Sequence, residues 1–333
     1  MILSPAIIAL ISCALLISGF AVYAALTGLH ILRDWDMQSG SETQLMLERK
    51  TYLISAIFSH ILIAELLSLV LFIFTADRIH DRFVGAMCAA GALNVNAFGY
   101  PGLILKTANF ILCGLWLIVN HTDRQAPDYP LIRPKYRFLM AISALLVAEA
   151  FVQVRYFAGM RANVITSCCG TLFSENVPTL SGDLASLPPR PAAVLFFISV
   201  ILTLCSGAHF WRTGRLATVF SRFAAWLLVF SVVCIISFIS VCFYELPTHH
   251  CPFCILQAEY HYIGYPLYLS LFTGGIAGMG VGVLEQLSGP ASLESVIPAI
   301  QKKLCIISIA GYAIFTAITL WPMLFSDFIF LGY

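Results

Sequence analysis

One short run of the sequence carries most of its recognisable chemistry, His249-His250-Cys251-Pro252-Phe253-Cys254. Two cysteines in a CxxC spacing can exchange disulfides, because one thiolate attacks a disulfide and the other resolves the mixed disulfide that forms. The run directly precedes a long apolar segment, so Pro252 is expected at the first helical position and Cys254 in the first turn. The positive end of the helix dipole would then favour the thiolate. We therefore expect Cys251 and Cys254 to be catalytic redox cysteines.

The same run also offers the ligands of a soft-metal site. Sulfur and imidazole nitrogen are the donors that zinc and copper prefer. His249 or His250, together with Cys251, Cys254 and a cysteine from another loop, would complete such a set. A purely structural disulfide is a third interpretation, but closing so short a loop adds little stability in the chain-entropy model. Redox chemistry is favoured over metal binding, and the metal interpretation stays open.

A second cysteine cluster, Cys168-Cys169, lies in the long loop between the fourth and fifth apolar segments. Adjacent cysteines bridge each other only with strain, so each is expected to face another partner. A further cysteine, Cys88, lies in the Gly/Ala/Asn-rich stretch 84–101, which is too polar and interrupted to cross lipid. Such a stretch is predicted to be re-entrant or to lie at the surface, where protein or water satisfies its backbone.

Composition identifies the elements that must position these residues. The chain of 333 residues is 60% hydrophobic and only 11% charged, whereas a soluble domain carries about 25% charged residues. The net charge of +1 gives no electrostatic support for nucleic-acid binding. A spanning helix needs about 20 apolar residues, and such segments predict an all-α polytopic membrane bundle in a single domain of residues 1–333. The eight expected spans are 5–32, 51–76, 102–120, 137–157, 192–211, 218–245, 255–284 and 303–325.

The distribution of Lys and Arg predicts the orientation in the bilayer. Alternate connections hold twelve of these residues and the other connections hold six, so the first set is expected in the cytoplasm. The first set is Arg33, Arg49, Lys50, Arg124, Arg133, Lys135, Arg137, Arg212, Arg215, Arg222, Lys302 and Lys303, and the second is Arg78, Arg82, Lys106, Arg155, Arg161 and Arg190. Cys88, Cys168, Cys169, Cys251 and Cys254 would then face outward. Disulfides form and persist on the outside of a bacterial inner membrane and in the lumen of the secretory pathway. Of these two, we expect a bacterial inner membrane, with the cysteine loops on the periplasmic side.

Over residues 137–284 the order of these features resembles the vitamin K epoxide reductase family of membrane thiol oxidoreductases. In that family a helix leads to an outer loop with a Cys-x-x-aliphatic-(Phe/Leu)-Ser pattern, two helices follow, and a CxxC opens the next. Here 169–174 matches the loop pattern and 251–254 matches the active pair. The resemblance implies a four-helix core at 137–284, with N-terminal helices in 1–136 and a C-terminal helix in 285–333.

The resemblance also implies roles for individual residues. Cys254 would face a membrane quinone, Cys251 would exchange with the loop, and Cys169 or Cys168 would pass electrons to or from an external thiol or disulfide protein. The family's second loop cysteine has no counterpart near Arg161. The run that begins at Cys88 shares Gly and Leu in register with the 168–172 loop, and if this echo reflects duplication, Cys88 is the missing exchange partner. The function so implied is a quinone-linked thiol–disulfide oxidoreductase.

Polar residues within or beside the spans are the remaining candidates. Glu65 and Glu149 lie mid-span, where ionisable groups are costly and are functional candidates. Either could deliver protons for quinone chemistry, or be a neutral group hydrogen-bonded between helices. Glu259 and His261 follow the CxxC within two turns and could line its pocket.

Two alternative functions remain. One is a membrane protein that binds or transports copper, zinc or mercury through Cys and His ligands. The other is a membrane subunit of a quinone or haem electron-transfer complex, with two histidines as haem ligands. The histidines considered for haem are His30, His60, His121 and His209.

Overall fold

The computed structural model describes residues 4–36, 41–161, 164–166, 173, 180–185 and 187–326. Within these ranges the structure is helical, with an isolated β-bridge between Val84 and Ile165. Among the residues that the structure describes, eight helices are long and apolar enough to cross a membrane, which confirms the predicted all-α polytopic bundle. The long helices are α1 (Pro5–Asp34), α2 (Glu42–Arg78), α4 (Gly99–Asp123), α5 (Ile132–Ala158), α8 (Pro189–Thr213), α9 (Ala217–Cys234), α11 (Gly264–Gln286) and α12 (Val296–Phe325). A π-helical turn, Ile235–Ile239, joins α9 to α10 (Ser240–Tyr244), so these three elements form one span.

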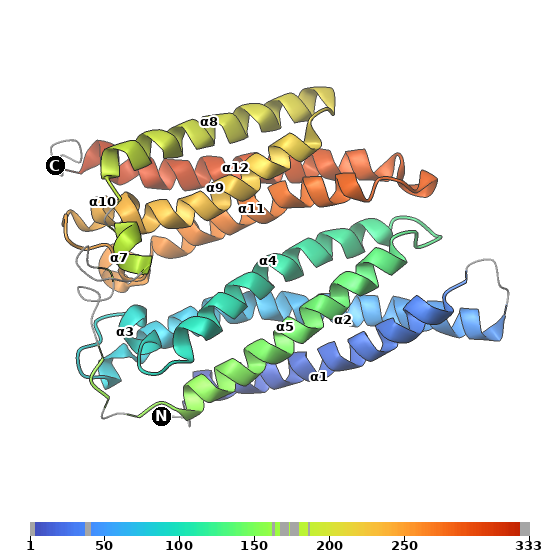
Figure 1. The fold of residues 1–333 in the computed structure, drawn as a ribbon, viewed down its shortest axis with the longest axis horizontal. Coiled ribbons are helices and arrows are strands. Elements are labelled where there is room, and N and C mark those ends of the chain that lie inside the picture. The colour runs from blue at the N-terminus through green and yellow to red at the C-terminus, as the bar shows by residue number, and fades with distance from the viewer. Residues whose placement is uncertain are drawn as a thin grey trace. The chain divides into compact units, whose positions relative to one another are not determined.

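The chain forms two compact units. Unit 1 consists of 1–75, 95–162 and 286–297, and unit 2 consists of 76–94, 163–285 and 298–333. Unit 1 holds α1, α4, α5 and most of α2, and unit 2 holds the helices from α8 to α12 with the short helices α3 (Ala89–Leu93) and α7 (Leu180–Ala185) (Figure 1). The division into packing units tests neither the expected single domain nor the expected core at 137–284, so both stay predictions.

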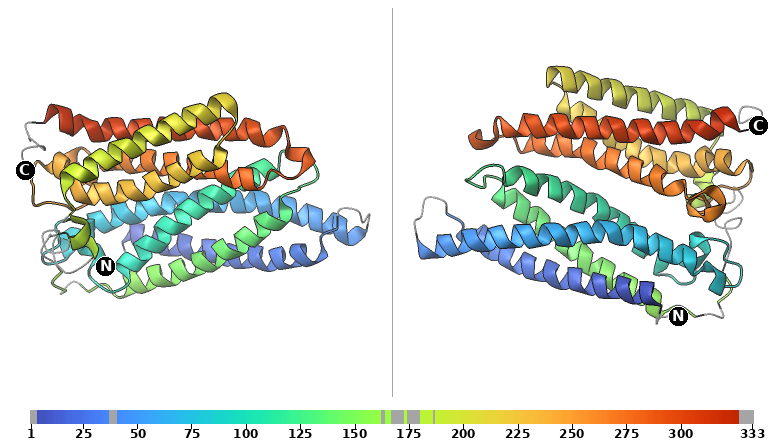
Figure 2. Two further views of the ribbon diagram at one scale, coloured as in Figure 1. Left: turned by 45° about the horizontal axis from the view of Figure 1, so that its top comes forward. Right: turned by 180° about the vertical axis from the view of Figure 1, so that it is seen from behind.

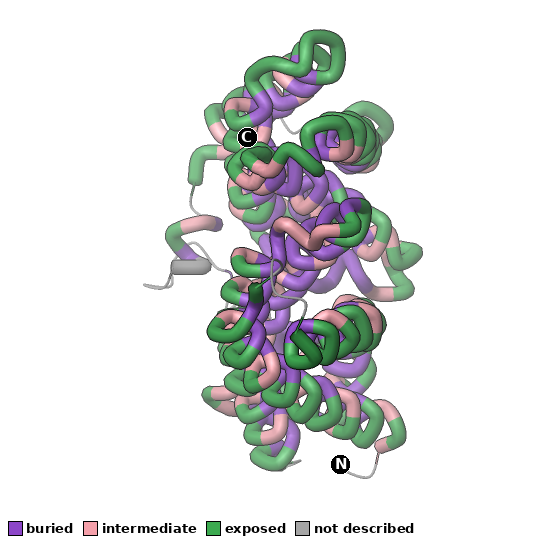
Figure 3. Tube along the Cα trace, turned by 90° about the vertical axis from the view of Figure 1, so that its right-hand side faces the viewer, coloured by how far each residue is buried: buried purple, intermediate pink, exposed green. Residues whose placement is uncertain are grey.

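Unit 1 is held by close packing of helices. Helix α5 lies alongside α1 and α4, as Figures 1 and 2 show. Gly28 of α1 allows this approach, because a Cβ there would lie 2.9 Å from the Tyr136 ring of α5. The rings of Phe58 and Trp116 meet edge to face with their centroids 5.5 Å apart. Buried residues lie along the helix faces that meet one another, and exposed residues lie along the outer faces (Figure 3).

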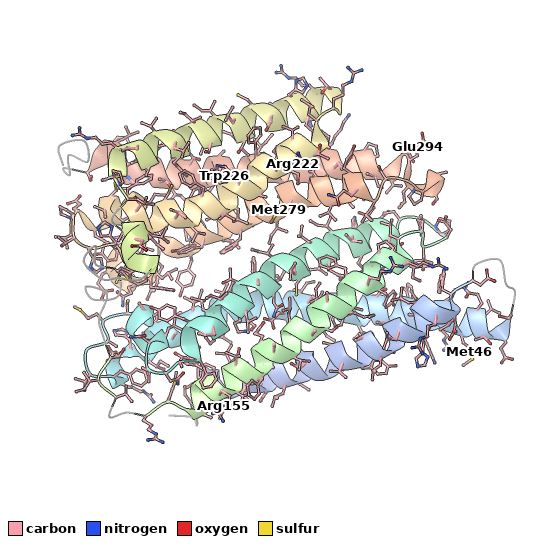
Figure 4. All side chains as sticks on the ribbon, in the orientation of Figure 1. Met46, Arg155, Arg222, Trp226, Met279 and Glu294 are labelled. Carbon is pink, nitrogen blue, oxygen red and sulfur yellow. The ribbon has the colours of Figure 1, made fainter. Side chains whose placement is uncertain are left out.

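Unit 2 is held together by an aromatic cluster and by glycines. Phe196 of α8 contacts Phe238 of the π-helical turn and Phe315 of α12, with ring centroids 5.9 and 6.0 Å apart. Gly274 lets α11 approach α12, because a Cβ there would lie 3.1 Å from the Tyr312 backbone nitrogen. Trp226, labelled in Figure 4, donates its indole N–H from α9 to the Ser199 hydroxyl of α8 at 3.3 Å.

The structure corrects the predicted start of the seventh span and adds detail to the stretch 84–101. The seventh span was expected from residue 255, but α11 begins at Gly264, and the CxxC lies instead in a loop with two 3-10 turns, Cys254–Leu256 and Ala258–Tyr260. The backbone turns left-handed at residues 261 and 262, with φ of 53° and 56°, which interrupts any helix there. Cys254 is therefore not in the first turn of a membrane helix, and the helix-dipole argument for its thiolate does not hold. The stretch 84–101 contains the five-residue buried helix α3, so it is too broken to span.

Candidate redox or metal site

Three cysteines of unit 2 gather into one buried cluster, Cys88, Cys251 and Cys254. The Sγ atoms of Cys88 and Cys251 lie 3.6 Å apart although 163 positions separate them in sequence. All three sulfurs lie within 4.8 Å of one another. Cys88 and Cys251 are fully buried and Cys254 is 6% exposed. We call these three residues the sulfur cluster.

Cys88 is positioned by the chain around α3. It precedes α3 in an extended conformation, and its carbonyl accepts hydrogen bonds from the backbone N–H groups of Gly91 and Ala92 at 3.1 and 3.3 Å. Thr166 anchors this segment, since its hydroxyl donates to the Gly91 carbonyl at 2.9 Å and its N–H to the Val84 carbonyl at 3.0 Å. In the sequence, Cys168 thus follows by two positions a residue that is bound to the segment around Cys88.

Two tyrosines from neighbouring helices position the CxxC. The Tyr244 hydroxyl, at the end of α10, donates to the Cys251 carbonyl at 2.6 Å and accepts from the Ile255 N–H at 2.8 Å. The Tyr268 hydroxyl, on α11, donates to the Pro252 carbonyl at 2.7 Å. These bonds satisfy backbone groups of a buried loop that has no helix ladder of its own. The loop is therefore held by side chains at both ends of the CxxC.

Two further bonds act on the sulfurs and on the loop that carries them. The Phe253 N–H points to the Cys251 Sγ at 3.5 Å, an arrangement that favours the thiolate form. The Gln257 side chain donates to the Met87 carbonyl at 3.0 Å, which ties the CxxC loop directly to the residue before Cys88. Sequence reasoning missed Tyr244, Gln257 and the Phe253 contact, because none belongs to a motif.

His249 lies beside the sulfur cluster, whereas the His250 side chain contacts the π-helical turn. The His249 Nε2 lies 3.4 Å from the Cys254 Sγ, and its ring packs against Tyr244 with centroids 4.6 Å apart. Burial lowers the pKa of His249, and the neighbouring His250 lowers this pKa further while Cys88 opposes the shift. A neutral imidazole can accept a thiol proton or bind a metal. The His250 Nδ1 instead lies 3.0 and 3.2 Å from the carbonyls of the π-helical turn.

Of the other predicted site residues, Glu259 and His261 belong to the same unit as the sulfur cluster. Cys168 and Cys169 lie outside the described residues. Glu259 and His261 are exposed on the loop surface, so the structure does not bring them into the cluster. The four histidines considered as haem ligands, His30, His60, His121 and His209, are all exposed on their helices.

Glu65 and Glu149 belong to unit 1 and share one ion-pair partner, Lys106, whose position was predicted wrongly from the sequence. Lys106 was counted among the outer connections, but it is 1% exposed and lies inside unit 1. Its Nζ is 3.2 Å from the Glu65 Oε1 and 2.6 Å from the Glu149 Oε1. Lys106 was misplaced because it lies only seven positions after the start of α4, where side chains usually reach the interface.

No protein-family model, curated protein or solved structure matches the chain. The resemblance to vitamin K epoxide reductases therefore stays an expectation, and the functional argument rests on the geometry of the sulfur cluster.

Proposed function

We propose that the protein is an integral membrane thiol–disulfide oxidoreductase that works through the sulfur cluster. The observation that carries the proposal is the approach of the Cys88 and Cys251 sulfurs to 3.6 Å, with Cys254 beside them. A disulfide bond measures about 2.05 Å, so the two sulfurs need to close by only about 1.6 Å. Side-chain rotation supplies such a shift without rebuilding the backbone. Cys88 thus takes the exchange role that an outer-loop cysteine has in the resembled family.

The proposed reaction is an exchange between the cluster and an external thiol or disulfide. The Cys251 thiolate attacks one sulfur of an incoming disulfide, and the displaced sulfur leaves as a thiolate that takes up a proton. Cys254 or Cys88 then attacks the Cys251 sulfur of the mixed disulfide and releases the second partner thiol. Two cluster thiols become one disulfide while the partner disulfide becomes a dithiol, a transfer of two electrons and two protons. His249 is placed to accept the Cys254 proton.

The exchange is reversible, so an external dithiol that becomes a disulfide reduces the cluster disulfide to two thiols. A quinone is then the proposed membrane acceptor, because it returns these two thiols to a disulfide and becomes a quinol by accepting two electrons and two protons. The neighbours of the cluster include aromatic rings that suit a quinone in kind, among them Phe173 and Phe253 with centroids 6.4 Å apart. The hydroxyls of Tyr244 and Tyr268, however, are engaged with backbone groups. We therefore assign no hydrogen-bonding residue to the quinone.

The proposed site faces the outside of a bacterial inner membrane. Eight spans place the chain in a bilayer, and the Lys and Arg bias supplies the orientation. Lys106 and Lys135 are buried and paired with acids, so neither counts as a loop charge. Removing them leaves eleven residues against five, and the bias persists. The external partner is a thiol or disulfide protein, and Cys168 and Cys169 are the proposed relay to it.

Disulfide mapping of the full-length protein tests the redox proposal. Reduced protein in detergent is treated with a soluble quinone or with glutathione disulfide, and disulfides are mapped by mass spectrometry. We expect bridges within the sulfur cluster, loss of all of them in Cys251→Ser, and loss of the Cys88 bridge alone in Cys88→Ser. Cys305→Ser is the matched control, because Cys305 on α12 is fully buried and its thiol donates to the Gly207 carbonyl of α8 at 3.3 Å. Folded protein whose three cluster thiols resist both oxidants would refute the proposal.

One observation favours a second candidate, a soft-metal site. Tetrahedral zinc with Zn–S bonds of about 2.3 Å holds its sulfurs about 3.8 Å apart and a sulfur and a nitrogen about 3.6 Å apart. The Cys88–Cys251 separation of 3.6 Å and the His249–Cys254 separation of 3.4 Å come close to these values. The ligands would be three cysteines and His249, a set used by structural zinc sites. The protein would then bind or transport zinc, copper or mercury.

Metal analysis separates the two candidates. Full-length protein is loaded with zinc or copper(I), desalted, and its metal content measured. The metal proposal expects one ion per chain that is lost in both Cys88→Ser and His249→Ala, together with no disulfide in the metal-loaded protein. The redox proposal expects His249→Ala to slow disulfide exchange without preventing it.

A further inference from the structure

A second buried polar cluster lies in unit 1. Lys106 on α4 donates to Glu65 on α2 at 3.2 Å and to Glu149 on α5 at 2.6 Å. It also donates to the Ser68 hydroxyl, one turn from Glu65. All three charged residues are at most 2% exposed. We call Glu65, Lys106 and Glu149 the acid–lysine triad.

Charge counting shows that the acid–lysine triad needs one more positive charge. Two carboxylates and one ammonium sum to −1, and an uncompensated charge is costly among membrane helices. The other titratable groups that act on the triad among the described residues are Cys13 of α1 and Cys113 of α4. Neither thiol can supply a positive charge. A proton or a monovalent cation must therefore balance the triad.

The arrangement of the carboxyl groups favours the proton. Glu65 and Glu149 both contact the Lys106 Nζ, at 3.2 and 2.6 Å, so their carboxyl groups lie close together in a buried site. Like-charged carboxylates that share a site do not both ionise readily, so such a pair holds one proton between them.

Two orphaned amide oxygens beside the triad are the second, independent observation. Asn109, fully buried on α4, donates its amide N–H to the Glu149 Oε2 at 2.6 Å, yet its Oδ1 has no donor within the described part of the chain. Gln153, one turn beyond Glu149, donates to the Leu10 carbonyl at 2.8 Å, and its Oε1 likewise has no donor there. Buried acceptors are normally satisfied, so these oxygens indicate a mobile donor such as water next to the carboxyl groups.

We propose that the acid–lysine triad is a proton-binding site that takes up and releases one proton, shared between Glu65 and Glu149. In the loaded state one carboxyl group is neutral, the other pairs with Lys106, and the triad is uncharged. On release the proton passes as hydronium to water at Asn109 and Gln153, and the triad carries −1. Lys106 fixes the capacity at one proton, because its ammonium compensates only one of the two carboxylates. The proposal does not depend on the redox function of the sulfur cluster.

The buried pair Asp123–Lys135 is a built-in comparison within the same unit. Lys135 of α5 donates to Asp123 at the end of α4, and the Leu131 N–H donates to the other Asp123 oxygen at 2.8 Å. One acid and one base balance each other, so this pair needs no additional proton. It closes the turn between α4 and α5 and has a structural role.

Infrared difference spectroscopy of the full-length protein in lipid nanodiscs tests the proposal. The signal is the C=O stretch of protonated carboxyl groups, identified by isotope-labelled glutamate and by its shift in heavy water. We expect one such group per chain at neutral pH, lost in Glu65→Gln and in Glu149→Gln. In Lys106→Met both acids must be protonated to remain neutral, so the band area should double. Asp123→Asn and Glu259→Gln are controls that should leave the band unchanged.

Each other outcome overturns the proposal. A folded wild-type protein without a protonated glutamate at neutral pH would show that the triad is a permanent salt bridge. A glutamate band that appears only when sodium and potassium are replaced by choline would show that a metal cation, not a proton, balances the triad. A glutamate band that persists in both Glu→Gln variants would assign the proton to another site. The wild-type measurement alone decides the first two outcomes, so a variant that fails to fold does not leave the proposal untested.

Discussion

Tyr244→Phe tests how strongly one hydroxyl group, that of Tyr244, holds the CxxC loop in place. That hydroxyl satisfies the Cys251 carbonyl and the Ile255 N–H, and both residues are fully buried. Phenylalanine keeps the ring contacts but leaves two buried backbone groups without this partner, and each such group costs about 1–3 kcal/mol. Two such groups together cost about 2–6 kcal/mol, so we expect opening of the CxxC loop to become easier by that amount. A free-energy difference of about 1.4 kcal/mol corresponds to a factor of ten, so the open population should rise by about 30-fold to 20,000-fold.

Alkylation of Cys251 measures this opening, because its fully buried sulfur reacts with a maleimide only when the loop opens. Rates are compared at low reagent concentration, where the rate follows the open population, in a background that lacks the exposed Cys205. Tyr268→Phe is the matched control, since it removes one bond, to the Pro252 carbonyl, and should raise the rate by about 5-fold to 150-fold for a cost of about 1–3 kcal/mol. A Tyr244→Phe rate within threefold of wild type, or below that of Tyr268→Phe, would refute the assigned geometry.

Three further predictions concern the same site. His249→Gln should remove a pH dependence of loop opening. Burial lowers the pKa of His249 in the folded loop, so this residue stabilises the closed loop fully above the ordinary pKa of about 6.5, and the stabilisation declines as the pH falls through the lowered pKa. A pH profile of alkylation that is the same in His249→Gln and wild type would contradict this. Gln257→Ala should raise alkylation of Cys88 about fivefold, for the loss of a hydrogen bond worth about 1 kcal/mol, with no change at Cys305. Gly85→Ala should lower the thermal stability of the protein and the yield of the Cys88–Cys251 disulfide, because φ is +88° at Gly85 and a Cβ there would meet the Thr166 carbonyl. An unaltered disulfide yield in folded protein would count against the anchoring role of Thr166.

The spans could be predicted because a sufficiently long run of apolar residues identifies a membrane-spanning helix from the sequence alone. The segment predicted at 137–157 became α5, Ile132–Ala158, with errors only at the ends. The seventh span failed at its start because the apolar Ile255 and Leu256 extend the hydrophobic run toward the CxxC, while the backbone turns left-handed at His261 and Tyr262. Hydropathy does not report such turns, and neither residue is a usual left-handed residue.

The site could be predicted only as far as a local motif reached. The CxxC marked Cys251 and Cys254 from sequence, whereas the approach of Cys88 depends on tertiary contacts through Thr166 and Gln257. The weak echo around Cys88 indicated the right residue but gave no distance. Lys106 shows the opposite failure, since a basic residue near a helix start resembles an interfacial anchor until the two acids from other helices are placed beside it.

The composition of each buried cluster indicates more about its chemistry than burial alone. Asp123 and Lys135 are as buried as any residue of the acid–lysine triad, yet one acid and one base neutralise each other and leave nothing to exchange. The triad has one acid more than it has bases, and that excess creates its capacity for a proton. The sulfur cluster follows the same logic, because two thiols can only close a bridge while a third can resolve a mixed disulfide or complete a metal site. In both clusters the members come from distant parts of the chain, so Cys88→Ser tests the sulfur cluster and Glu65→Gln or Glu149→Gln tests the triad by removing one member.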